Sequence, residues 1–73
     1  MPGEISNDLG FRLTAERNGR TTAAYLYLPN HPASAGCVAR TVRLDSVLDH
    51  KGRPEIMLDL DASGAVIGIE ILT

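Results

Sequence analysis

The 73-residue sequence is poor in cysteine and in aromatic residues, and it has no tryptophan. Cys37 is the only cysteine, which excludes an intramolecular disulfide and therefore a secreted, disulfide-stapled scaffold. Three aromatic side chains, Phe11, Tyr25 and Tyr27, are too few for a platform that stacks successive nucleic-acid bases. No apolar run reaches the length of a membrane-spanning helix, so no membrane partner is expected.

Basic residues are also scarce, since seven Lys and Arg face nine Asp and Glu and leave a net charge of −2. A nucleic-acid binder usually carries a basic face, so nucleic acid is not expected as a partner. The charge is uneven: residues 1–44 hold five Arg and three acids, whereas residues 45–73 hold six acids and two bases. Such a dipole can steer the chain toward another protein or a second copy, but a simply mixed surface is the more ordinary interpretation of this charge distribution. The first ten residues lack a signal-peptide pattern, which predicts a cytoplasmic protein.

The length allows one domain with a marginal core of its own. Hydrophobic residues make up 44% and charged residues 22%, which is typical of a globular protein. We expect a single antiparallel β domain over residues 9–73, preceded by a flexible segment over residues 1–8.

Hydrophobic residues alternate with period two in five short runs, and no run has the 3.6-residue period of an amphipathic helix. This pattern predicts an all-β, or at most β-rich α+β, fold: a small antiparallel meander of about five strands. The predicted strands cover residues 9–15, 22–28, 37–45, 55–60 and 65–72. One helical turn is allowed over residues 46–49.

Two hairpins follow from the turn sequences. Asn18-Gly19 suits a type I′ turn, which would pair Arg17 with Arg20 and set Arg12 opposite Tyr25 as a cation–π pair. The segment 61–64 suits a type I turn between the last two strands, which would set Leu58 opposite Ile67. In both hairpins the apolar side chains then share one face, as a correct register requires.

That apolar face needs a cover, and the sequence offers no helix to provide it. Barrel closure, a second copy and a different protein are the possible covers. Because the chain is short, we expect a homodimer. The function favoured by this pattern is a non-enzymatic protein-interaction domain that self-associates.

Tyrosine and arginine are the usual anchors of protein interfaces. The interface candidates are therefore Arg12, Tyr25 and Tyr27, together with Arg40, which interrupts the apolar pattern of the third strand. Gly68, inside the last strand, indicates a bulge or a large neighbouring side chain.

The segment from Asp59 to Glu70 has the spacing of a twelve-residue calcium loop, with Asp61, Ser63 and Gly64 at the expected positions. Both flanks alternate as strands, however, so Glu70 would lie far from the aspartates, and we interpret the segment as a hairpin turn. An acidic hairpin of Asp59, Asp61 and Glu70 that binds a metal or small ligand is an alternative function.

The remaining reactive residues form no recognisable motif. His31 and His50 lie in connections without metal-ligand spacing, and Cys37 reads as a small packed side chain. We therefore expect no catalytic residue, no metal and no cofactor.

Four segments resemble a prokaryotic family known as domain of unknown function 2283. They are residues 24–28, 39–42, 58–64 and 66–72, the last containing Gly-Ile-Glu-Ile-Leu. The residues that match the family motif are Asp59, Asp61, Gly64, Gly68 and Glu70. The resemblance implies a small protein without an established activity, in some members an antitoxin-like partner of a small toxin. Residues 17–22 replace an acidic stretch of the family, so any role of those acids does not carry over.

Overall fold

The computed structural model describes residues 3–6, 8–47 and 52–73 of the chain. Asp49, in the predicted helical turn, and His50 lie outside the described residues. No helix in the described part of the chain is long and apolar enough to cross a membrane.

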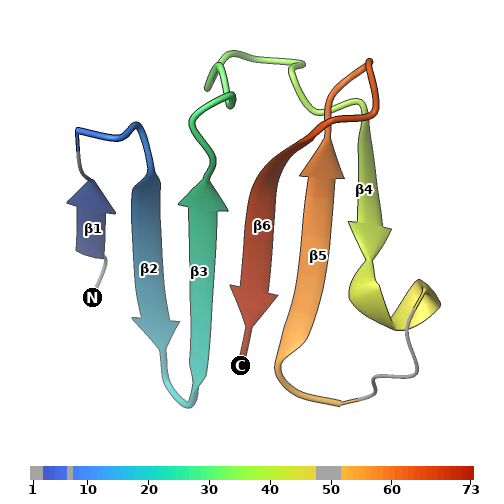
Figure 1. Ribbon diagram of the computed structural model, residues 1–73. Coiled ribbons are helices and arrows are strands. Elements are labelled where there is room, and N and C mark those ends of the chain that lie inside the picture. The colour runs from blue at the N-terminus through green and yellow to red at the C-terminus, as the bar shows by residue number, and fades with distance from the viewer. Residues whose placement is uncertain (1–2, 7, 48–51) are drawn as a thin grey trace.

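The described residues form one six-stranded sheet in which every neighbouring pair is antiparallel (Figure 1). The strands are β1 (Gly3–Ser6), β2 (Arg12–Asn18), β3 (Thr21–Tyr27), β4 (Arg40–Arg43), β5 (Glu55–Leu60) and β6 (Val66–Leu72). A single 3₁₀ turn, η1 (Leu44–Ser46), follows β4. The predicted fold class, a small antiparallel β domain with at most one helical turn, is confirmed.

The strand order is β1-β2-β3-β6-β5-β4, so two three-stranded meanders join through β3 and β6. Residues 28–39 connect the two meanders by passing across one end of the sheet (Figure 1). Because β3 pairs with β6, the last strand of each meander lies at the centre of the sheet and receives two partners. The edges are the short strands β1 and β4.

The strand bounds differ from the predicted ones by more than one residue at three places. Gly10 has a φ of +92°, which interrupts the first predicted strand, so β2 begins only at Arg12. Leu9 and Phe11, expected on the apolar face, are 72% and 37% exposed. The third predicted strand shrinks to Arg40–Arg43. Finally, Gly3–Ser6 lies within the segment expected to be flexible, yet it pairs with β2 as a strand.

The register of the first hairpin is two residues away from the prediction, which was wrong. Asn18 pairs with Thr21, and the turn is made by Gly19 and Arg20 rather than by Asn18 and Gly19. Gly19 has a φ of +66°, whereas no positive φ occurs at Arg20, which is the pattern of a type II′ turn. Because the shift is even, each side chain keeps its predicted face.

The second hairpin is also shifted, with Leu58 opposite Ile69 instead of Ile67. The type I turn forms as predicted, since the Gly64 N–H donates to the Asp61 carbonyl at 3.0 Å. A register change between Asp59 and Leu60 marks a β-bulge. The bulge absorbs one extra residue of β6, which the sequence pattern does not reveal.

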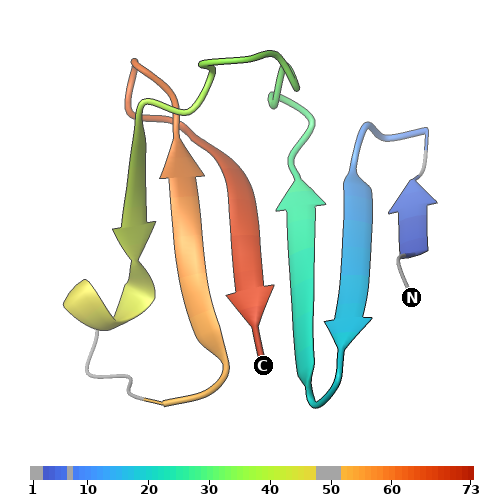
Figure 2. The same ribbon diagram turned by 180° about the vertical axis from the view of Figure 1, so that it is seen from behind.

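One face of the sheet is apolar across five strands. The register aligns Leu13, Leu26, Ile69, Leu58 and Val42 in one row, and Ala15, Ala24, Ile71 and Ile56 in the next. All nine are only half-buried, and within residues 8–47 and 52–73 only Ile67 and Gly68 are buried. No second layer covers this face in either view of the ribbon (Figures 1 and 2). We call these nine residues the apolar face.

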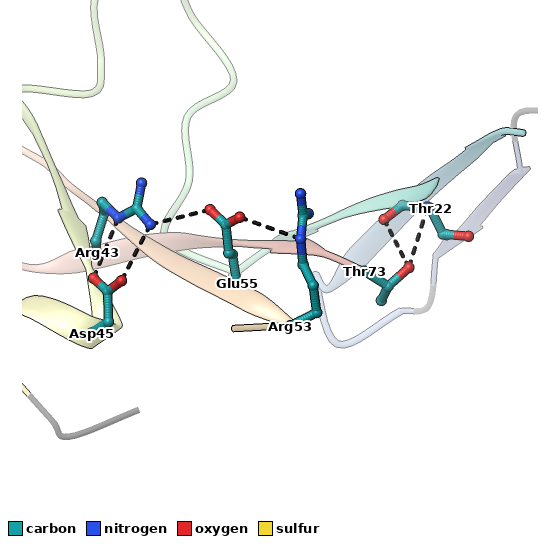
Figure 3. Close-up of polar contacts among 6 residues, drawn as sticks. All are labelled: Thr22, Arg43, Asp45, Arg53, Glu55 and Thr73. Atoms are coloured by element: carbon teal, nitrogen blue, oxygen red, sulfur yellow. Dashed lines mark hydrogen bonds and ion pairs between the residues drawn. The ribbon is translucent and has the colours of Figure 1, made fainter. Parts of the chain in front are cut away.

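Ion pairs link the end of β4, the turn η1 and the start of β5 (Figure 3). Arg43 reaches Asp45 and Glu55, each at 3.2 Å, and Glu55 also meets Arg53 at 3.4 Å. The hydrogen bond to Asp45 is the main cause that raises the pKa of Arg43 above its usual value. All of these groups are exposed or nearly so, which makes the cluster a rim feature of modest energy.

Candidate functional site

The opposite face of the sheet carries rings and polar groups, and we call it the polar face. The register aligns Arg12, Tyr27, Gly68, Asp59 and Thr41 in one row. The next row holds Thr14, Tyr25, Glu70, Met57 and Arg43. Three of the four interface candidates, Arg12, Tyr25 and Tyr27, therefore lie on one surface.

A hydrogen-bonded network crosses four strands at the centre of the polar face. The Tyr25 hydroxyl on β3 donates to Asp59 Oδ2 at 2.6 Å, and the Thr41 hydroxyl on β4 donates to Asp59 Oδ1 at 2.7 Å. Burial, followed by the hydrogen bond to Asp59, raises the pKa of Tyr25 well above its usual value. The carboxylate thus links a side chain of the first meander, Tyr25, to one of the second, Thr41.

Gly68 is the strand position that lets this network form. It lies between β3 and β5, directly beneath the ring of Tyr25, and a Cβ at residue 68 would overlap the tyrosine hydroxyl. The prediction that Gly68 accommodates a close neighbour or a bulge is confirmed, because both occur there.

An aromatic cluster lies beside the network, at the end of the sheet crossed by residues 28–39. The rings of Tyr25 and Tyr27 meet edge to face at 4.7 Å, and His31 lies 4.8 Å from Tyr27. The Arg12 guanidinium lies 3.9 Å above the Tyr27 ring. The predicted cation–π contact therefore exists, but its partner is Tyr27 and not Tyr25, because of the two-residue register shift.

Arg40 does not join this cluster. It lies on β4 opposite Leu60, two positions from Val42 and thus on the same side of the sheet as the apolar face. Its side chain is exposed at the edge of the sheet. The four interface candidates are consequently divided between the two faces.

Asp61 is committed to the hairpin turn. Its Oδ1 accepts hydrogen bonds from the Ser63 hydroxyl at 2.6 Å, the Ser63 N–H at 2.9 Å and the Ala65 N–H at 3.1 Å. These bonds, with the Ser63 hydroxyl first, hold the pKa of Asp61 below its usual value. Gly64, at a φ of +88°, completes the turn.

Glu70 lies on the polar face of β6, two residues along the β5–β6 ladder from the pair formed by Asp59 and Gly68. It pairs with Tyr25 on one side and Met57 on the other, within β6. Both Asp59 and Asp61 already accept hydrogen bonds from protein donors. Among the described residues, no three His, Cys, Asp or Glu side chains gather closely enough to hold a metal ion.

Two residues of the polar face were not predicted from the sequence. Thr41 was only one polar position of an alternating strand, and His31 was one residue of a proline-containing loop. Their roles depend on pairing of β4 with β5 and on the path of the loop beyond β3. Neither is encoded in a local pattern.

The chain matches no known protein family, no curated protein and no solved structure. The resemblance to the domain of unknown function 2283 therefore stays a prediction, and the arrangement of the two faces carries the functional argument.

Proposed function

We propose that this chain is a non-enzymatic protein-interaction domain that forms a homodimer through the apolar face of its sheet. The observation that carries the proposal is the row of Leu13, Leu26, Ile69, Leu58 and Val42, one residue from each of five neighbouring strands. A sheet with one apolar face is stable in water only when a second layer covers that face.

The exposed surface of the chain supports this proposal quantitatively. The chain exposes 5176 Å². A compact monomer of this size exposes only about 4,400 Å². The excess of roughly 800 Å² is summed over the whole chain and is similar in size to the area that one partner contributes to an interface of standard size.

A second copy fits this face better than an unlike partner. A two-fold interface uses the same patch on both subunits, so the patch must complement itself. The nine residues of the apolar face are all uncharged and aliphatic, and two such sheets pack face to face at about 10 Å with no unpaired charge between them. Arg40, at the edge, lies where it can stay in water.

Sedimentation equilibrium of the wild-type protein at micromolar concentration tests the proposal directly. We expect a dimer, and a monomer that also fails to bind an apolar dye would overturn the proposal. Leu26→Lys, at the centre of the apolar face, is expected to shift the equilibrium toward monomer by at least about a hundredfold in Kd, because a buried unpaired charge costs several kcal/mol.

The matched control is Ala23→Lys, which places the same charge on the same strand but on the polar face. It is expected to leave the dimer intact. Equal dissociation by the two variants would mean that the charge acts without regard to face, and the proposed interface would be wrong.

A further inference from the structure

The turn between β2 and β3 contains an asparagine followed by a glycine. Asn18 is the last residue of β2, Gly19 is the first residue of the turn, and both are exposed. The turn lies at the end of the sheet opposite to the loop that follows β3 (Figure 1). Water therefore has access to both residues.

An asparagine that precedes a glycine can lose its side-chain amide without an enzyme. The main-chain nitrogen of the glycine attacks the Cγ atom of the asparagine, and a succinimide ring forms. In most residues the Cβ and the side chain crowd the attacking nitrogen, whereas glycine has neither. The attack also requires a carboxamide that is free to rotate and a glycine nitrogen without a hydrogen-bond acceptor.

The carboxamide of Asn18 meets the first requirement. Within the described parts of the chain, it neither donates nor accepts a hydrogen bond. The other described asparagine, Asn30, donates from Nδ2 to the Val66 carbonyl at 3.2 Å. It also precedes His31, whose ring packs on Tyr27 at 4.8 Å. Asn18 thus lacks both of the restraints that hold Asn30.

The backbone of Gly19 meets the second requirement. In a two-residue hairpin turn the closing hydrogen bonds join the flanking residues, here Asn18 and Thr21, so no bond of the ladder uses the Gly19 N–H. A Cβ on Gly19 would have no atom within 4 Å apart from its chain neighbours, which leaves open space beside the nitrogen. The φ of +66° is suited to glycine, so the turn itself requires this residue.

The position of Asn18 at the end of β2 keeps the required movement small. An extended backbone holds Cγ away from the following nitrogen, so Asn18 must leave the strand conformation before the ring can close. Only its pairing with Thr21 has to open, because this is the last pair of the ladder. Opening at a strand end costs far less free energy than global unfolding.

Positive charge lies next to the pair. Arg17 and Arg20 flank it in the sequence, and Arg17 Nε donates to the Gly19 carbonyl at 3.2 Å. The Gly19 nitrogen must give up its proton in order to attack, and a nearby positive charge favours the anion that results.

We propose that Asn18 is a deamidation site, at which the chain reacts with its own backbone and then with water. The Gly19 nitrogen loses its proton and bonds to Asn18 Cγ, the bond from Cγ to Nδ2 breaks, and the side-chain nitrogen leaves as ammonia. Water then opens the succinimide. Attack at Cγ releases the Gly19 nitrogen from the side chain and gives aspartate. Attack at the main-chain carbonyl carbon breaks its bond to Gly19 and gives isoaspartate, in which the chain continues through Cγ.

Both products place a new negative charge at the tip of the β2–β3 hairpin. Isoaspartate also lengthens the main chain at the residue that pairs with Thr21, so it alters the pair that closes the hairpin. Asn18 lies an even number of positions from Arg12 on β2 and therefore on the side of the polar face. The site is accessible in the proposed homodimer and independent of it.

Incubation of the intact wild-type chain in ¹⁸O-labelled water at neutral pH tests the proposal. Digestion with pepsin at acidic pH, where deamidation is slow, is followed by mass spectrometry of the peptides. We expect residue 18 to lose its amide nitrogen and gain ¹⁸O, and an isoaspartate-specific methyltransferase to methylate part of the product. Asn30 is expected to keep its amide over the same period. No loss at Asn18, an equal loss at Asn30, or aspartate without isoaspartate would overturn the proposal.

Asn18→Gln provides the variant test. The longer side chain would have to close a larger and less favourable ring, so we expect the methyltransferase signal to be lost. Asn30→Gln is the matched control and is expected to leave the signal unchanged. Dispersed amide spectra verify that both variants are folded. A signal that persists in Asn18→Gln would place the isoaspartate at another residue, and the proposal would be wrong.

Discussion

The ring of Tyr25 occupies the space that a side chain at residue 68 would need. Its hydroxyl passes over Gly68 on β6 and donates to Asp59 on β5 at 2.6 Å. The absence of one Cβ thus permits a hydrogen bond that links the two three-stranded meanders, because Tyr25 belongs to the first and Asp59 to the second.

Gly68→Ala tests this relationship. The new methyl group must displace the Tyr25 hydroxyl from Asp59, and we expect a loss of about 1–3 kcal/mol in the free energy of unfolding, as for other overpacked sites. Urea denaturation at fixed protein concentration measures the loss.

The control is the same substitution in a Tyr25→Thr background. With the ring removed, alanine is expected to stabilise the strand by about 0.5–1 kcal/mol relative to glycine. The effect of the substitution should therefore change sign. An equal loss in both backgrounds would show that the conflict at residue 68 does not involve Tyr25.

Tyr25→Phe keeps the ring and removes the hydrogen bond to Asp59, so we expect a loss of about 1 kcal/mol at neutral pH. The pKa of Tyr25 is raised in the folded protein, so the contribution is fully present below the ordinary value of 10.0 and is lost as the pH rises above it. The difference in urea midpoint between the wild type and Tyr25→Phe should therefore narrow above that pH. A difference that stays constant with pH would contradict the role assigned to the hydroxyl.

The contribution of Asp61 to stability has the opposite pH dependence, and it changes at acidic pH. Its pKa is lowered in the folded protein, mainly by the Ser63 hydroxyl. Its contribution to stability is therefore present above the ordinary value of 3.8 and is lost as the pH falls through the lower folded value. Asp61→Asn should remove this acid-dependent loss.

Carboxyl ¹³C titration by NMR gives the direct measurement for Asp61. Ser63→Ala is expected to bring the pKa of Asp61 back toward its usual range while leaving the hairpin formed, since the two backbone donors remain. An unchanged pKa in this variant would mean that the Ser63 hydroxyl is not the main cause.

Several features of the fold were accessible to prediction because they depend on local patterns. The range predicted for the fourth strand, residues 55–60, coincides with β5. The type I turn that begins at Asp61 forms as expected, because an aspartate followed three positions later by a glycine suits only a few backbone geometries. As predicted, Tyr25 and Tyr27 lie on the face of the sheet opposite to Leu26, since successive strand residues alternate between faces.

The registers of the two hairpins could not be predicted from the sequence. A shift of two residues returns every side chain to its original face, so the hydrophobic pattern cannot distinguish Arg12 opposite Tyr25 from Arg12 opposite Tyr27. The turn type decides the register, and Asn18-Gly19 and Gly19-Arg20 are both acceptable as turn centres. The bulge near Asp59 could not be predicted either, because one extra residue does not change the composition of the strand in a recognisable way.

In the candidate site, too, the residues could be predicted but their contacts could not. Arg12, Tyr25 and Tyr27 were identified by residue type, Asp59 by the calcium-loop spacing and Gly68 as a glycine inside a strand, and the last two also belong to the family motif. That Tyr25 donates to Asp59, that Thr41 donates to the same carboxylate and that His31 packs on Tyr27 depend on contacts between distant parts of the chain.

By itself, the alternation of apolar and polar residues determined that this chain forms antiparallel strands with one aliphatic face, because a strand exposes successive side chains to opposite sides. Only the tertiary structure decided which strands are neighbours, since the pairing of β3 with β6 depends on contacts between residues more than forty positions apart. That pairing places Tyr25 over Gly68 and within hydrogen-bond reach of Asp59 on β5.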